Sequence, residues 1–331
     1  MLTGIKTLFK MKKLPKITIG ILNYNGLDYL RKTIPPLFSL NYPDYEILLV
    51  DNGSKDESLK YLSKLNNIRI IKNKNNLGYC VGKNQIVRNA KGIYVLLLDE
   101  DILVTDKSCL LKFLSFHESK KCGFICPVLV NKGERATSMY GGFWGPFAYG
   151  TRPTVKVSNI IKRDYIEVVG VEGGAIFFKK NHFLNIGLYD ETQPYYLDVG
   201  DINIRSYILT GKKNYSLYNL CFIHLGVQRK VDTKKWAWKL QYMFPGAMRI
   251  LWKNFTLKNA LLFSPTIFLF YFCGSLYQTV KRRSFLVIKS FIWSFLFFLK
   301  SFPDTIKERG KIQGKRVIKS DLFLKIKRPS F

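Results

Sequence analysis

Short apolar runs alternate with helix-length segments between residues 16 and 104. The runs predict buried strands at 17–22, 46–50, 68–71 and 94–98, and the intervening segments predict helices at 27–40, 56–65 and 81–90. Pro35 and Pro36 are expected to break the first helix, and Ser54 or Asp56 to cap the second. This alternation is typical of βαβ units, so the sequence predicts an α/β fold, a mostly parallel Rossmann-like sheet with helices on both faces.

Each predicted strand stops at a polar residue. Asn23, Asp51 and Asp99 follow three of the strands directly, and Asn73 follows the remaining one closely. In open α/β sheets the ligand crevice lies outside the carboxyl ends of the strands. We therefore expect the functional groups to gather at these four points.

The pattern is less regular after residue 104. Residues 109–165 show no clear period, and the stretch 140–153, YGGFWGPFAYGTRP, is rich in rings and glycines, so it is expected to be a loop that covers the core or lines a cleft. Residues 168–179 resemble two strands joined by a glycine turn. Residues 183–188 and 198–209 look helical, and Gly211 is expected to end the second of these helices.

The C-terminal part is both basic and apolar. The 331-residue chain carries a formal charge of +30, and residues 226–331 contain 22 Lys or Arg but only 4 Asp or Glu. Residues 259–280 contain no charge and residues 284–299 only Lys289, with Lys281, Arg282 and Arg283 between the two segments. A basic and apolar tail favours an anionic membrane surface as partner and not a nucleic acid, because a phosphate-binding surface does not need long apolar runs.

Three arrangements of the two apolar segments remain open. They could form a transmembrane hairpin, lie in the membrane interface, or pack as a buried helix pair. A hairpin with cytoplasmic flanks would place the basic turn on the far side, against the positive-inside tendency, so interfacial helices are favoured.

The sequence predicts a basic extension at 1–15, an α/β domain at 16–230 with halves at 16–104 and 105–230, and a membrane-associated helical tail at 231–331. The six cysteines form no CxxC pair, which indicates a reducing compartment. The lysine-interrupted N-terminus does not resemble a secretory signal. We therefore expect a membrane-associated protein on the cytoplasmic face.

Paired acids and a polar turn are the chemical candidates. Asp99 and Asp101 reach the crevice from one buried strand, and such carboxylates commonly hold Mg²⁺ or Mn²⁺ together with substrate phosphates. The alternative is a solvated acidic loop. Asp51 begins an Asn-Gly turn and could accept hydrogen bonds from a nucleobase or ribose, or merely cap the turn.

Taken together, the motifs resemble glycosyltransferase family 2, inverting enzymes of GT-A fold. In the first half these are ILNYNG at 21–26, LVDNGSKD at 49–56, NKNNLGYCVGKN at 73–84, KG at 91–92 and LLLDED at 96–101. In the second half they are VEGGA at 171–175, GLYDE at 187–191, LDVGDINIR at 197–205 and HLG at 224–226. The resemblance covers residues 16–230.

The resemblance implies roles for particular residues. Asp99 and Asp101 would face the diphosphate and the metal, with His224 completing the metal shell, although a lone histidine after an apolar run is more often structural. Gly173 and Gly174 would lie on the acceptor side. The nucleotide sugar would be held by Asn23, Asn25, Asp51, Gly53, Asn73, Gly78, Asn84 and Asp99.

The general base has two candidates. Many family members have adjacent acids there, whereas here Asp198 and Asp201 are separated by two residues, as in rhamnosyltransferase-like members. Asp198 is favoured, since Asp201 can pair with Arg205 one helical turn away.

The function implied is inverting transfer of a sugar from a nucleoside-diphosphate sugar to a hydroxyl of a saccharide acceptor, which we expect to be lipid-linked. A nucleotidyltransferase is the enzymatic alternative, but ILNYNG lacks the basic residues of a phosphate loop. The other alternative is a catalytically inactive, membrane-bound nucleotide-sugar or glycan-binding protein.

Overall fold

Four parallel strands form one half of a large sheet in the computed structural model. They are β1 (Ile17–Asn23), β2 (Tyr45–Asp51), β3 (Ile68–Lys72) and β4 (Tyr94–Asp99), in the order β3-β2-β1-β4. All four strands predicted from the apolar runs are present. The register places Asn23 beside Asp51 and Leu22 beside Asp99, so the polar strand ends meet at one edge.

The structure describes residues 13–131, 135–137, 143–144, 150–151, 155–156, 164–192, 197–226 and 232–321. In the second half, β12 (Ala175–Lys179) runs antiparallel between β4 and β6 (Phe124–Asn131). The sheet continues through β7 (Arg135–Thr137) and β10 (Val155–Lys156). The long strand β13 (Asn214–His224) pairs with β6, β5 (Ile102–Val104) and β11 (Tyr165–Val168), which carries His224 to the loop after β4.

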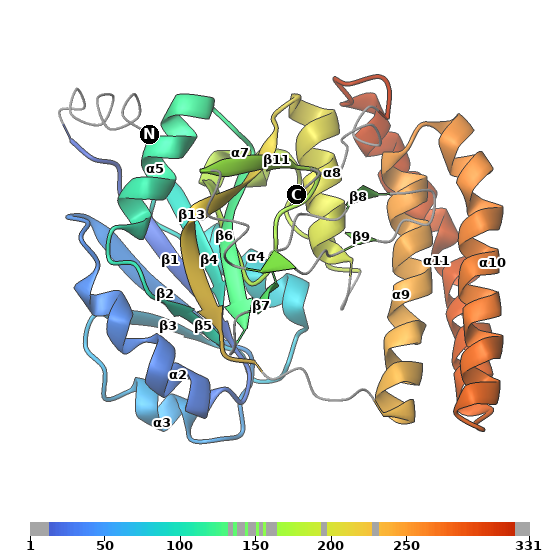
Figure 1. Cartoon of the computed structure of the whole chain (residues 1–331), viewed down its shortest axis with the longest axis horizontal. Coiled ribbons are helices and arrows are strands. Elements are labelled where there is room, and N and C mark those ends of the chain that lie inside the picture. Colours follow the sequence, from blue (N-terminus) through green and yellow to red (C-terminus); the bar gives the residue numbers. More distant parts are fainter. Residues whose placement is uncertain are drawn as a thin grey trace.

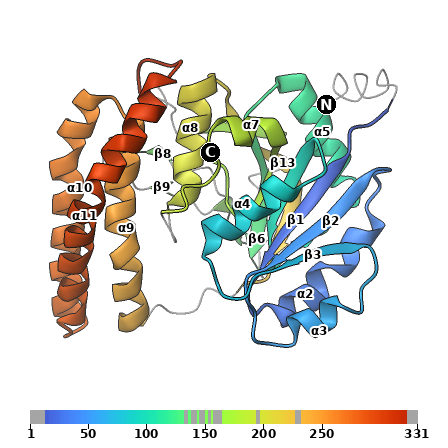
Figure 2. The same cartoon turned by 180° about the vertical axis from the view of Figure 1, so that it is seen from behind.

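Helices cover both faces of the sheet (Figures 1 and 2). Successive residues of β4 enter different cores, because side chains alternate along a strand: Leu96 and Leu98 pack in one core, Val95 and Leu97 in the other. The first core includes side chains of α2 (Leu27–Thr33), the 3₁₀ helix η1 (Pro35–Ser39), α3 (Ser58–Leu62) and α5 (Cys109–Lys120). The second includes side chains of α4 (Tyr79–Asn89), α7 (Lys180–Asn185) and α8 (Asp198–Thr210).

Several boundaries differ from the sequence prediction. The helix predicted at 27–40 stops at Thr33 and continues as η1, because Pro35 and Pro36 cannot donate hydrogen bonds. The helix predicted at 56–65 shortens to α3. The region read as irregular contains α5 and β6, and α5 buries Leu110, Phe113 and Leu114 at helical spacing. Gly211 ends α8 in the left-handed conformation, as predicted.

Little can be described of the aromatic segment 140–153. Its pieces β8 (Phe143–Trp144) and β9 (Gly150–Thr151) pair antiparallel, and its other residues lie outside the described residues. The prediction that it lines a cleft therefore stays a prediction. The same holds for most of the basic extension at 1–15.

The tail consists of three long helices that pack around a third hydrophobic core. They are α9 (Thr233–Asn254), α10 (Leu257–Lys281) and α11 (Leu286–Gly314). The amphipathic helix α9, which the sequence reading did not anticipate, lies between the sheet domain and the other two (Figure 1). Phe244 of α9 packs on Phe268, Phe291 and Phe298, while Ile204 and Ile208 of α8 join the same core.

Helices α10 and α11 expose much of their apolar surface. Each is long and apolar enough to cross a membrane, with mean hydropathy of 1.6 and 1.4, and only 22% and 28% of the most apolar window is buried. Large apolar side chains are exposed along their length, among them Leu261, Leu262, Leu269, Tyr277, Val280, Phe285, Trp293, Leu296 and Leu299.

Candidate active site

A buried ion pair stands at the end of β4. The Nζ atom of Lys83 lies 2.7 Å from Oδ1 of Asp99 and donates to the Leu98 carbonyl oxygen at 2.7 Å. Lys83 reaches this place from α4, is fully buried, and lies 5.2 Å from the centre of the Tyr79 ring. Asp99 is thus partly exposed to solvent, with the buried positive charge of Lys83 beneath it.

Asp101 turns toward β13. Its Oδ2 lies 3.0 Å from Nε2 of His224, a contact that bridges the loop after β4 and the end of β13. The hydrogen bond to Asp101 raises the pKa of His224. Gly226 leaves room beside this pair, because a Cβ atom there would lie 2.3 Å from the Asp101 oxygen. The structure therefore brings together two of the three groups expected around a metal.

These groups fit a divalent cation in part. Within the described residues, no three His, Cys, Asp or Glu side chains converge as a metal site. Asp101 and His224 supply one oxygen and one nitrogen donor in the cradle beside Gly226, whereas Asp99 is engaged by Lys83. A cation held by two side chains needs further oxygens, which substrate phosphates commonly supply.

Four of the residues expected to hold the nucleotide surround the ends of β1 and β2. Asn23 donates to Asp51 Oδ2 at 2.8 Å, and Asp51 Oδ1 accepts the Ser54 amide at 3.0 Å. Asn25 accepts the Lys55 amide at 2.7 Å. Gly53 adopts a positive φ of 80°, and a Cβ atom there would lie 2.6 Å from the Asn75 backbone. The two strand-end turns are thus tied together at one edge of the sheet.

The remaining candidates for nucleotide binding lie in the loop before α4 and on α4 itself. Asn73 exchanges hydrogen bonds with Gln85 at 2.8 and 3.0 Å and donates to Asn52. Gly78 has a φ of 89° and precedes the first residue of α4. Asn84 is fully buried and binds the backbone of Tyr189 in both directions, so its side chain braces the 187–192 loop.

The two acceptor-side glycines have different surroundings. Gly173 lies under α8, where a Cβ atom would be 2.7 Å from Val199 Cγ2, and its carbonyl accepts the Tyr79 hydroxyl at 3.2 Å. Gly174 is packed beneath apolar side chains, Ile102 and Leu129, each 3.1 Å from an added Cβ. Of the two, Gly173 is the one that lies against the first turn of α8, which carries Asp198.

Asp198 is a buried acid with one carboxylate oxygen that has no hydrogen-bond partner among the described residues. It opens α8 and is 7% exposed, and the oxygen in question is Oδ2. Burial, with a further contribution from the Asp99 charge, raises the pKa of Asp198 to about 7. A buried carboxyl group with a pKa near neutrality can take up a proton under physiological conditions.

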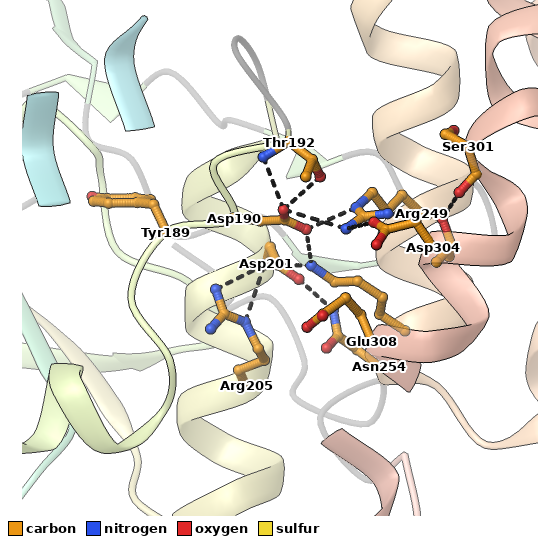
Figure 3. A network of polar contacts seen from close by, with 12 residues as sticks. Tyr189, Asp190, Thr192, Asp201, Arg205, Arg249, Asn254, Ser301, Asp304 and Glu308 are labelled. Atoms are coloured by element: carbon orange, nitrogen blue, oxygen red, sulfur yellow. Dashed lines mark hydrogen bonds and ion pairs between the residues drawn. The ribbon is translucent and has the colours of Figure 1, made fainter. Parts of the chain in front are cut away.

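Asp201, the other candidate base, is locked in a network of ion pairs (Figure 3). Its Oδ2 lies 2.8 Å from Arg205 and 3.0 Å from Lys253, and its Oδ1 accepts from Asn254 at 2.7 Å. The predicted pairing with Arg205 is confirmed. Although burial acts the other way, Arg205 and Lys253 hold the pKa of Asp201 below its usual value, so this carboxylate is a poor proton acceptor.

Sequence reading missed Lys83 and Tyr79 as members of the site. Both lie on the buried face of α4, one turn apart, and contact Asp99 and Gly173. A lysine between Gly82 and Asn84, on the side of a helix that faces the sheet, was the available signal.

The fold matches known GT-A structures. GalNAc-T7, solved with UDP, GalNAc and Mn²⁺, superposes with a TM-score of 0.61 at 13% identity, over 89% of this chain and 58% of that one. Residues 1–349 of S. aureus TarS, solved with UDP-GlcNAc, give a TM-score of 0.54 at 15% identity, over 91% and 88% of the two chains. The arrangement of the sheet and its helices is therefore that of a GT-A glycosyltransferase fold.

The family follows from the sequence comparison. The model of glycosyl transferase family 2 matches residues 18–186. The chain belongs to glycosyltransferase family 2, a family of transferases that includes polysaccharide synthases.

Curated relatives match over shorter stretches. An uncharacterized glycosyltransferase of Rickettsia bellii is 25% identical over 54% of this chain and 26% of its own length. WfaP of Escherichia coli, named a UDP-Glc:alpha-D-GlcNAc-diphosphoundecaprenol beta-1,3-glucosyltransferase, is 34% identical over 33% of this chain and 43% of its own length. The poly-beta-1,6-N-acetyl-D-glucosamine synthase of Staphylococcus epidermidis is 24% identical over 50% and 40%. The chain thus spans less than half of each relative.

Proposed function

We propose that this protein transfers a sugar from a nucleoside-diphosphate sugar to a hydroxyl group of a saccharide acceptor, with inversion of the anomeric centre and Asp198 as the general base. One observation carries the proposal: Asp198 is a buried carboxyl group with a pKa raised to about 7, and it lies close enough to Asp99 at the end of β4 for the Asp99 charge to contribute to that shift. The polar turns after β1 and β2 open at the same edge and would take the nucleotide.

The reaction is a single displacement. The acceptor oxygen forms a bond to the anomeric carbon while the bond from that carbon to the diphosphate oxygen breaks, and the electron pair leaves with the nucleoside diphosphate. Asp198 takes the proton of the acceptor hydroxyl. Nucleophile and leaving group lie on opposite sides of the carbon, so the configuration inverts.

Asp101 and His224 would hold a Mg²⁺ or Mn²⁺ ion on the leaving-group side. Such an ion stabilises the negative charge that develops on the diphosphate. Lys83 contributes a fixed positive charge next to Asp99, and Asn23 with Asp51 positions the turns that would contact the nucleoside.

A transfer assay tests the proposal. Thermal-shift measurements with UDP, GDP and dTDP in the presence of Mn²⁺ first identify the nucleotide, since a ligand that binds only the folded state raises the melting temperature. Transfer to saccharide acceptors is then followed for the wild type, Asp198→Asn and Asp28→Asn, an exposed acid in α2 that serves as matched control. We expect loss of transfer only in Asp198→Asn.

Two outcomes would contradict the assignment. Full activity of Asp198→Asn would show that Asp198 is not the general base. Nucleotide binding by the wild type without any transfer or donor hydrolysis would favour a catalytically inactive binding protein instead.

The tail supports a lipid-linked acceptor at a membrane surface. Exposed apolar side chains of α10 and α11 are accompanied by Lys281, Arg282 and Arg283, a combination that suits an anionic lipid interface. WfaP is named for a diphosphoundecaprenol-linked acceptor, and an acceptor of that kind would be presented at such a surface. None of the six cysteines forms a disulfide, in keeping with a location on the cytoplasmic face.

Vesicle flotation tests this part. The full chain should bind vesicles that contain anionic phospholipid, and replacing Leu261, Leu262 and Leu296 by Ser should weaken binding while leaving transfer to a soluble acceptor unchanged. Equal flotation of both proteins would count against membrane association through α10 and α11.

A further inference from the structure

Asp190 and Asp201, which flank Asp198 in sequence, both form ion pairs with Lys253 of the tail. Lys253, in the last turn of α9, forms ion pairs with Oδ2 of Asp190 and, at 3.0 Å, with Oδ2 of Asp201. Its side chain is 3% exposed and that of Asp201 is fully buried. Asp190 belongs to the 187–192 loop and Asp201 to the first turn of α8, so one ammonium group joins the two segments.

Both segments contain backbone that needs support. Leu188 and Leu197 have positive φ angles of 62° and 63°, a conformation that non-glycine residues adopt only when their surroundings hold them there. Arg205 donates to the carbonyl oxygens of Ile186 and Leu188, and the Asp201 amide donates to the Leu197 carbonyl at 3.1 Å. Leu197 directly precedes Asp198, so the placement of the base depends on this framework.

The tail supplies most of the cations and amides that complete the framework. Arg249 lies one turn before Lys253 on α9 and donates to Asp190 at 2.7 Å, while its other nitrogens contact Asp304 and Thr305 of α11 at 2.9 Å. Asn254 donates to Asp201. The first turn of α8 is therefore held against α9 by charge-assisted bonds and not only by apolar packing.

We propose that Lys253 is a positioning residue for the general base: by bridging Asp190 and Asp201 it fixes the first turn of α8, which makes the tail part of the catalytic apparatus as well as a membrane contact. The inference rests on the proposed role of Asp198. Lys253 itself touches neither the crevice residues Asp99 and Asp101 nor the nucleotide edge, so its effect should fall on the chemical step and not on donor binding.

The test compares Lys253→Met, Lys253→Arg and Lys311→Met. Methionine keeps the length of the side chain but not its charge, arginine keeps the charge, and Lys311 is an exposed lysine on α11 paired with Glu308. We expect Lys253→Met to lower kcat at least tenfold with donor KM within twofold of wild type. Lys253→Arg should restore kcat to within about threefold, and Lys311→Met should behave as wild type.

Asn254→Ala keeps the inference testable should Lys253→Met fail to fold. It removes one hydrogen bond to Asp201 and leaves the ion pairs, so we expect a smaller fall in kcat, about threefold, again with unchanged donor KM. Circular dichroism and thermal unfolding confirm the folded state of each variant.

The outcomes separate two failures. An inactive wild type contradicts the proposed function. If the wild type is active and a folded Lys253→Met or Asn254→Ala variant keeps wild-type kcat, the positioning role alone is overturned. The same holds if the donor KM rises by the same factor as kcat falls.

Discussion

The ammonium group of Lys83 lies 2.7 Å from the carboxylate of Asp99, and the lysine is the only one of the two that is fully buried. Asp99 reaches solvent at the crevice, whereas Lys83 is enclosed by α4, β4 and the Tyr79 ring. A cation in this place neutralises an acid at the point where a diphosphate is expected, and it does so without occupying the crevice.

Asp99→Asn should destabilise the fold. It leaves the fully buried Lys83 ammonium without its carboxylate, and an uncompensated buried charge typically costs about 3–5 kcal/mol. Urea unfolding of the single variant and of Lys83→Met with Asp99→Asn measures the effect. The double variant should be the more stable of the two, because no orphan charge remains; equal stability would show that the pair is not coupled.

Transfer should depend on the ionisation of Asp198. The base must be deprotonated to accept a proton, and its pKa is raised to about 7. We therefore expect kcat/KM to rise with pH through about 7 and to level off above it, since this ratio reports ionisations of the free enzyme. A profile of kcat/KM between pH 5 and 9 measures this, and a flat profile from pH 5 upward would contradict the raised pKa.

Asp198→Asn should stabilise the protein at neutral and alkaline pH. The folded-state pKa of about 7 lies above the unfolded value of about 3.9, so ionisation of this group lowers stability progressively as pH rises from about 4 to 7. Asparagine removes that loss. Melting temperatures at pH 5 and pH 8 should show a larger gain at pH 8, and a gain that is the same at both values would assign it to packing.

Metal dependence should require His224 and Asp101. His224→Ala removes the nitrogen donor of the pair and should raise the Mn²⁺ concentration for half-maximal activity by about tenfold or more. Activity is titrated with Mn²⁺ for this variant and for His182→Ala, whose ring contacts Ser206 and Phe124 and neither Asp101 nor Asp99. An unchanged Mn²⁺ requirement would show that His224 does not bind the metal.

The strands at the site could be predicted because their signals are local. Each of the four apolar runs ends in a polar residue, and parallel pairing brings those ends to one edge, so Asn23, Asp51 and Asp99 were found from the pattern alone. The family motifs located Asp198 and His224 as well. The register of β13 with β5 then explains how a histidine distant in sequence reaches Asp101.

The features of the site that the sequence did not predict depend on contacts between segments that are far apart in the chain. Nothing near Asn84 shows that its amide binds Tyr189 in the 187–192 loop, and nothing near Asp201 shows that a lysine of the tail will face it. Likewise α9 carries charged residues among its apolar ones, so only its position between α8 and α11 reveals that Arg249 and Lys253 are buried. Partners of buried charges are a property of the tertiary arrangement.

Arg249 and Lys253 of α9 also constrain how this protein can be divided. A chain cut between His224 and Thr233 would leave the carboxylates of Asp190 and Asp201 without these two cations, and it would uncover Ile204 and Ile208, which pack in the core shared with α9. An enzyme shortened in this way should not be expected to behave as an autonomous soluble unit. A chimeric protein with the C-terminal helices of a relative would need two basic residues one helical turn apart, placed so that they contact Asp190 and Asp201.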